Sequence, residues 1–130
     1  MKLNPDCIRD ILLTVEEVTD FDTRLVYIMS DNQFSKLQKY THQEIIYHIR
    51  QAEESDLIMG VSYPDSGEMC IICDLSPFGH EFLANIRKDN IWNNIKSISK
   101  QIGSTSLNAL VQISSNVITE IIKAQFNLNA

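Results

Sequence analysis

Residues 57–75 constrain the fold of this chain most strongly, because two short apolar runs flank a strong turn there. The runs cover residues 57–63 and 68–75, and the turn sequence PDSG (64–67) lies between them. Proline presets a turn φ, aspartate and serine hydrogen-bond to the local backbone, and glycine tolerates positive φ. The segment therefore predicts a β-hairpin.

Two helices are predicted before this hairpin. The first covers residues 5–18, where Asn4 can act as the cap and apolar residues recur at helical spacing. The second opens with a capping box, in which a hydroxyl at Thr41 is followed three residues later by the carboxylate of Glu44. It runs to about Ser55, directly before the hairpin.

The segment between these helices predicts a short strand and a loop. The strand is LVYI at residues 25–28, which is rich in β-forming side chains. Residues 30–40 are polar with scattered aromatics and are expected to be mostly loop. We expect Phe34, Leu37 and Tyr40 to pack against the core.

Two helices are predicted directly after the hairpin. Ser76 can cap the first, with Pro77 at its first position, and the Asp89-Asn90 pair is expected to interrupt it. Gly79 is expected to let this helix approach a neighbouring backbone closely. The second helix runs from about Ile91 until Gly103 stops it.

A last helix is predicted from Ser104 or Thr105, and it is the most regular amphipathic segment of the chain. Its apolar stripe must be buried, either against the first helix of the same chain or against a second subunit. Self-association is slightly favoured, and we assign the dimer contact to four stripe residues. They are Leu110, Val117, Ile118 and Ile121.

The order helix, strand, helix, hairpin, helix is typical of winged-helix domains, in which the hairpin forms the wing. We therefore predict an α+β fold: a winged-helix-like domain at residues 1–90 with a small antiparallel sheet, and a helical C-terminal extension at 91–130. The extension is expected to pack on the domain or on a second subunit. The segment before Thr41 gives only a weak candidate for the additional short helix of a helix-turn-helix.

Three stretches resemble one family. They are the start MKLNPDCIRDILLTVEE, the run YTHQEIIYHIRQAEESDLIMG and the run LSPFGHEFLANIRKDNIWNNIK. The chain resembles, over nearly its whole length, an uncharacterised bacterial and phage family catalogued as domain of unknown function 2513. The resemblance implies a phage or prophage setting and a winged-helix-like junction, and it implies no activity. This chain has Ser55-Asp56 where the family tends to have Ala-Gly, so the hairpin entry is expected to differ slightly.

Charge is unevenly distributed along the chain. The net charge is −6, with 11 acidic and 6 basic residues in 1–60 against 6 and 5 in 61–130. This balance argues against tight non-specific DNA binding, which relies on Lys and Arg at phosphates. Neither a signal peptide nor an apolar run of membrane-spanning length is recognisable, so we expect a cytoplasmic protein.

Motifs for catalysis and metal binding are weak. His80-Glu81 lacks the second histidine of a zinc-protease motif, since Ala84 occupies that position. Cys70 and Cys73 would point to opposite faces of a strand. We therefore expect no catalytic residue, no metal and no cofactor, and we predict that the protein is not an enzyme.

Two polar surfaces are candidate partner sites. In the helix over 41–55, the position that a recognition helix occupies in a DNA binder, Glu44, Tyr47, His48 and Gln51 are expected to face outward. A later basic patch comprises Arg87, Lys88, Lys96 and Lys100.

The leading functional interpretation is a non-catalytic phage or prophage regulatory or interaction module that binds a macromolecular partner and dimerises. A protein partner is favoured over DNA because of the acidic balance. One alternative is a sequence-specific DNA-binding transcriptional regulator. Another is a phage inhibitor of a host or defence protein, whose acidic face imitates nucleic acid.

Overall fold

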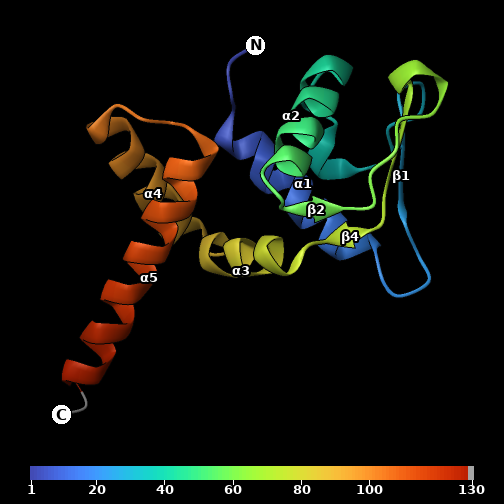
Figure 1. Cartoon of the computed structure of the whole chain (residues 1–130). Helices are drawn as coiled ribbons and strands as arrows, with labels where there is room; N and C mark the ends of the chain where they lie inside the picture. The colour runs from blue at the N-terminus through green and yellow to red at the C-terminus, as the bar shows by residue number, and fades with distance from the viewer. Residues whose placement is uncertain (129–130) are drawn as a thin grey trace. The chain divides into compact units, whose positions relative to one another are not determined.

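The computed structural model describes residues 1–128, and its α+β architecture confirms the predicted class (Figure 1). The chain divides into two compact units, which we call the N-terminal unit (residues 1–80) and the C-terminal unit (from residue 81). This division lies within α3. The elements, in order, are α1 (Pro5–Val18), β1 (Leu25–Ile28), η1 (Ser35–Leu37), α2 (His42–Glu54), β2 (Ile58–Met59), η2 (Asp65–Gly67), β3 (Met69–Ile72), β4 (Asp74–Leu75), α3 (Pro77–Ile86), α4 (Asp89–Ile102) and α5 (Leu107–Leu128).

Helices α1 and α2 pack against each other and supply much of the core of the N-terminal unit. The Asn4 side chain caps α1 by accepting a hydrogen bond from the Asp6 N–H at 3.0 Å. Leu37 of η1 is buried, as expected, whereas Phe34 and Tyr40 are only partly covered. The buried apolar side chains of the two long helices are Cys7, Ile8, Ile11, Leu12, Val15, Ile45, Ile49 and Ala52.

The ends of α2 follow the sequence signals closely. The capping box is present: the Glu44 N–H donates to the Thr41 hydroxyl and the Thr41 N–H donates to the Glu44 carboxylate, each at 3.1 Å. At the other end Asp56 takes a left-handed conformation with φ +59°, and the Leu57 N–H donates to the Ala52 carbonyl at 2.9 Å. This helix termination normally favours glycine, and Asp56 adopts it here.

The predicted hairpin doubles back as expected, but its strands are short and belong to two separate two-stranded sheets. β2 pairs antiparallel with β4, whereas β3 pairs antiparallel with the distant β1, in a register that places Tyr27 opposite Cys70. Gly60, with φ +66°, falls between the paired segments. A Cβ on Gly60 would lie 2.4 Å from the Cys73 sulfur, so this close approach requires glycine.

The start of α3 confirms the predicted junction. The Ser76 hydroxyl accepts a hydrogen bond from the Gly79 N–H at 2.9 Å and donates to the Asp56 carbonyl. A Cβ on Gly79 would lie 1.9 Å from the Leu57 carbonyl oxygen. Gly79 therefore lets the first turn of α3 rest on the end of the loop that follows α2.

The helices of the C-terminal unit begin at positions that differ from those predicted. α4 starts at Asp89 rather than near Ile91, and Gly103, with φ +75°, ends it as expected. α5 starts at Leu107 rather than at Ser104 or Thr105. The reason is that Ser106 makes the capping contacts: its hydroxyl accepts from the Ala109 N–H at 3.1 Å.

Helices α4 and α5 pack together as a helical pair joined by residues 103–106 (Figure 1). Trp92 and Ile95 of α4 and Leu107 and Leu110 of α5 are buried. Exposure increases toward the C-terminal end of α5, where Phe126 is 72% exposed. The C-terminal unit therefore covers only one end of its longest apolar stripe. Within residues 1–128, no helix has the combination of length and apolar character that crossing a bilayer requires.

Candidate interaction surfaces

The outward side of α2 differs from the predicted set by one residue. Glu44, Tyr47 and Gln51 are partly exposed, as a contact surface requires. His48 is only 1% exposed, so its predicted outward orientation is wrong.

His48 instead joins the starts of α1 and α2. Its Nε2 accepts a hydrogen bond from the Asn4 N–H at 2.8 Å, and its Nδ1 donates to the Glu44 carbonyl oxygen at 2.7 Å. These partners assign the neutral tautomer with the proton on Nδ1. The sequence pattern missed this arrangement because Asn4 lies 44 residues away along the chain.

A groove of about 480 Å³ runs beside α2 in the N-terminal unit, and we call it the α2 groove. His42, Ile46 and Arg50 contribute one side of it, at intervals of four residues that place them on one helix face. This spacing is visible in the sequence and could have identified the groove wall. The complete lining is His42, Gln43, Ile46, Arg50, Tyr63, Ser66 and Gly67.

The polar side chains of the α2 groove are held in place by contacts within the N-terminal unit. The His42 ring stacks on Tyr27, and its Nδ1 lies 2.8 Å from the Tyr27 hydroxyl. The Arg50 guanidinium carbon lies 5.9 Å from the centre of the Tyr63 ring. Burial and the hydrogen bond that Tyr63 donates to Glu53 raise the pKa of Tyr63, so this hydroxyl stays neutral at physiological pH. The groove therefore presents the Arg50 cation beside the rings of His42 and Tyr63.

The residues considered for catalysis or metal binding are dispersed. His80 is exposed, with its Nε2 3.7 Å from an Asp74 carboxylate oxygen. Cys70 is buried and Cys73 is half-buried. Burial raises the pKa of Cys70 to about 12, as it does that of Cys7. Across residues 1–128, no three His, Cys, Asp or Glu side chains come together in an arrangement that could hold a metal ion.

The predicted basic patch lies in the C-terminal unit. Arg87 and Lys88 connect α3 to α4, and Lys96 and Lys100 lie one turn apart on α4. The Lys96 ammonium is 5.6 Å from the centre of the Trp92 ring.

The two units carry opposite net charges. Residues 81–130 contain five basic and three acidic side chains, a net charge of +2. Residues 1–80 contain six basic and fourteen acidic side chains, a net charge of −8. The net negative charge of the chain therefore arises in the N-terminal unit, which would attract basic surfaces.

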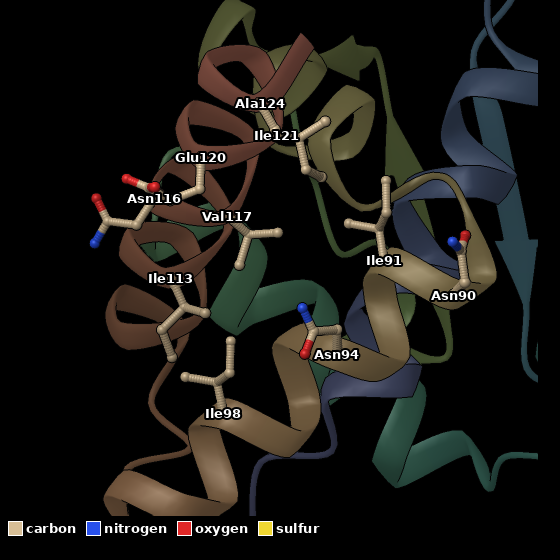
Figure 2. A pocket seen from close by; sticks show the side chains of 10 residues that line it. All are labelled: Asn90, Ile91, Asn94, Ile98, Ile113, Asn116, Val117, Glu120, Ile121 and Ala124. Carbon is tan, nitrogen blue, oxygen red and sulfur yellow. The ribbon is translucent and has the colours of Figure 1, made fainter. Parts of the chain in front are cut away.

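A second groove, of about 620 Å³, lies between α4 and α5, and we call it the α4–α5 groove. Figure 2 shows Ile98 beside Ile113, and Ile121 directed toward Ile91 across the gap between the helices. Its lining combines apolar side chains with three asparagines and Glu120. The complete lining is Asn90, Ile91, Asn94, Ile98, Ile113, Asn116, Val117, Glu120, Ile121 and Ala124.

The predicted dimer residues divide between the interior and this groove. Val117 and Ile121 line it, and Ile118 is half-buried elsewhere on α5. Leu110 is fully buried within the chain, so it is unavailable to a second subunit and its assignment to the dimer contact is wrong. The first turns of α5 are covered by the chain itself, which leaves only the later turns for a partner.

Comparison with known proteins identifies the family. A family model described as a hypothetical protein, DUF2513, matches residues 2–106. The chain belongs to this family. An uncharacterised protein of Haemophilus influenzae (strain Rd) is 31% identical to this DUF2513 protein over 124 residues, which cover 94% of this chain and 99% of the relative. No solved structure matches this chain. The family match ends at residue 106, directly before α5 begins.

Proposed function

We propose that this DUF2513 protein is a non-catalytic interaction module whose N-terminal unit binds a protein partner with a basic surface. The observation that carries the proposal is the net charge of −8 on residues 1–80. Charge complementarity accelerates association and selects between partners. A regulatory role in a phage or prophage is part of the proposal and rests on the family resemblance.

The exposed side of α2 and the α2 groove supply the contact surface. Tyr47 and Tyr63 offer aromatic area, and Arg50 is a cation that is already oriented on a ring. Tyr and Arg are the residue types enriched at energetically dominant interface positions. Glu44 and Glu54 on the same helix add charges that suit lysine or arginine on the partner.

Sequence-specific DNA binding is the second candidate, because α2 occupies the place of a recognition helix in the predicted winged-helix order. Arg50 is the one basic residue within α2, whereas the helix carries three glutamates. Phosphates would be repelled by this helix, since DNA affinity relies on neutralising backbone charge. The charge on the N-terminal unit therefore favours a protein over DNA.

A capture experiment with the immobilised full-length chain tests the proposal. We expect nuclease-treated bacterial lysate to yield a bound protein that elutes as salt is raised, because screening weakens attraction between exposed charges. Tyr47→Ala and Glu54→Gln should each reduce capture severalfold. Asp22→Asn, in the loop after α1, removes one charge from the same unit outside the α2 surface and should leave capture unchanged.

Two outcomes would overturn the protein-partner proposal. One is capture that disappears after nuclease treatment, together with retention of the chain on heparin until elevated salt, which would indicate nucleic acid. The other is capture that is equal for Tyr47→Ala, Glu54→Gln and Asp22→Asn.

A further inference from the structure

We propose that the α2 groove binds one carboxylate group of the basic partner, and that Arg50 is the residue that holds it. This inference deepens the proposed function and rests on it, because it names the chemical group of the partner that enters the groove. The carboxylate belongs either to the end of the partner chain or to one of its aspartate or glutamate side chains. Both sources present the same pair of oxygens, and the experiment below separates them.

The guanidinium of Arg50 is available to an anion. It projects from an exposed position of α2, with its central carbon 5.9 Å from the centre of the Tyr63 ring. Within residues 1–128, no aspartate or glutamate forms an ion pair with it. A guanidinium that rests on a ring and lacks an acidic neighbour keeps its fork of N–H donors for the two oxygens of a carboxylate.

His42 supplies a second donor to the groove. Tyr27 is 1% exposed, and its hydroxyl lies 2.8 Å from the His42 Nδ1. A buried hydroxyl needs an acceptor for its proton, so the Tyr27 hydroxyl donates and Nδ1 accepts. The ring proton of neutral His42 is therefore on Nε2, on the side of the ring away from Tyr27. Because His42 lines the groove, this N–H can donate to a bound anion.

The other polar groups of the lining are also suited to an anion. Gln43 carries an amide N–H₂ and Ser66 a hydroxyl, and both side chains are exposed. Acidic side chains are absent from the groove lining, although the unit as a whole is strongly acidic. Ile46 and Tyr63 offer apolar area for the carbon atoms next to the carboxylate. The groove is thus a local site for an anion on an acidic unit.

The charge of the site matches a carboxylate better than a phosphate. Arg50 is the one full positive charge of the lining, and it balances the single negative charge of a carboxylate. A phosphate monoester carries about −1.5 to −2 at pH 7, so part of its charge would remain unbalanced on a unit of net charge −8. Glutamates on α2 then suit lysine or arginine beside the carboxylate on the partner.

Binding of short labelled peptides to the full-length chain tests this site. Three lysine-rich peptides of one sequence are compared by fluorescence anisotropy at low salt: one with a free terminal carboxylate, one with a terminal amide, and one with a terminal amide and a glutamate in place of the last residue. We expect the free acid to bind about fivefold more tightly than the amide without glutamate. Net charge alone predicts the reverse order, because that amide is the more positive peptide.

The third peptide identifies the source of the carboxylate. It has the same net charge as the free acid, but its carboxylate is on a side chain. Affinity equal to that of the free acid would show that the groove accepts a side-chain carboxylate. Affinity equal to that of the other amide would restrict the groove to the end of a chain.

Replacing the arginine tests its role. Arg50→Gln should weaken binding of the free acid about fivefold and remove its advantage over the amide, although this change makes the unit more acidic. Arg24→Gln is the matched control, because Arg24 is also an exposed arginine of the N-terminal unit and lies outside the groove lining. This control should keep the preference for the free acid. Circular dichroism should show both variants folded like the unaltered chain.

Three results would overturn the carboxylate site: an absence of binding by all three peptides, an amide that binds as tightly as both peptides with a carboxylate, or an equal loss in Arg24→Gln and Arg50→Gln. The partner proposal has a separate test. Capture from lysate that depends on Tyr47 and Glu54 but is unchanged in Arg50→Gln would retain the protein partner and exclude the carboxylate contact.

Discussion

The two units of this chain differ in how completely they cover their apolar side chains. In the N-terminal unit, the inner faces of α1 and α2 are fully buried, and even the buried His48 has both ring nitrogens hydrogen-bonded. In the C-terminal unit, the α4–α5 groove remains open and the last turns of α5 expose Ile122 and Phe126. Two small sheets and several short elements close the first unit, whereas the two long helices of the second bury only their facing stripes. The N-terminal unit therefore differs from its surroundings mainly by its net negative charge, whereas the C-terminal unit leaves apolar side chains exposed.

The largest expected difference between the units is the response to truncation of an apolar side chain. Ile49→Ala should lower the free energy of unfolding by about 2–5 kcal/mol, because it leaves a cavity among fully buried neighbours. Ile122→Ala, at a position that is 50% exposed, should change it by less than about 0.5 kcal/mol. Urea unfolding followed by circular dichroism measures both. Similar losses for the two variants would show that the end of α5 is part of a monomer core.

A smaller loss is expected within the N-terminal unit, where the first turn of α3 contacts Leu57. Gly79→Ala should lower the free energy of unfolding by about 2–3 kcal/mol, because the added Cβ meets the Leu57 carbonyl oxygen and the backbone must shift. Gly67→Ala is a useful control, since open space surrounds that position and only its φ of +90° opposes alanine. We expect it to cost about 1 kcal/mol. If Gly79→Ala were stabilising, as glycine replacement in a free helix would be, the close approach would be wrong.

Local signals in the sequence predicted the elements, and contacts between distant residues account for most of the errors. The caps at Asn4, Thr41 and Ser76 lie within a few residues of the groups they satisfy, so the helix starts followed from short motifs. The pairing of β1 with β3 joins strands that are far apart along the chain, and no local motif encodes it.

The candidate surfaces were predicted only in part. Tyr47 and Gln51 lie partly exposed on α2 as expected, because helical periodicity assigns faces. His48 was assigned outward because histidine is polar, and its burial depends on the Asn4 N–H as a partner. The α4–α5 groove depends on how two helices diverge, and an apolar stripe does not specify that angle.

A further expected effect is a loss of stability at alkaline pH that arises from buried thiols in the N-terminal unit, where all three cysteines lie. Burial raises the pKa of Cys7 and Cys70 from 9.0 to about 12, so the folded state keeps these protons while the unfolded state releases them. The stabilisation is complete below pH 9 and is lost as pH rises toward 12. At pH 10 the loss should be about 1 kcal/mol for each buried thiol. Urea unfolding at pH 8 and 10 measures this loss. Cys70→Ala should reduce the loss by the contribution of one thiol. An unchanged pH response in Cys70→Ala would show that this thiol is not protected by the fold.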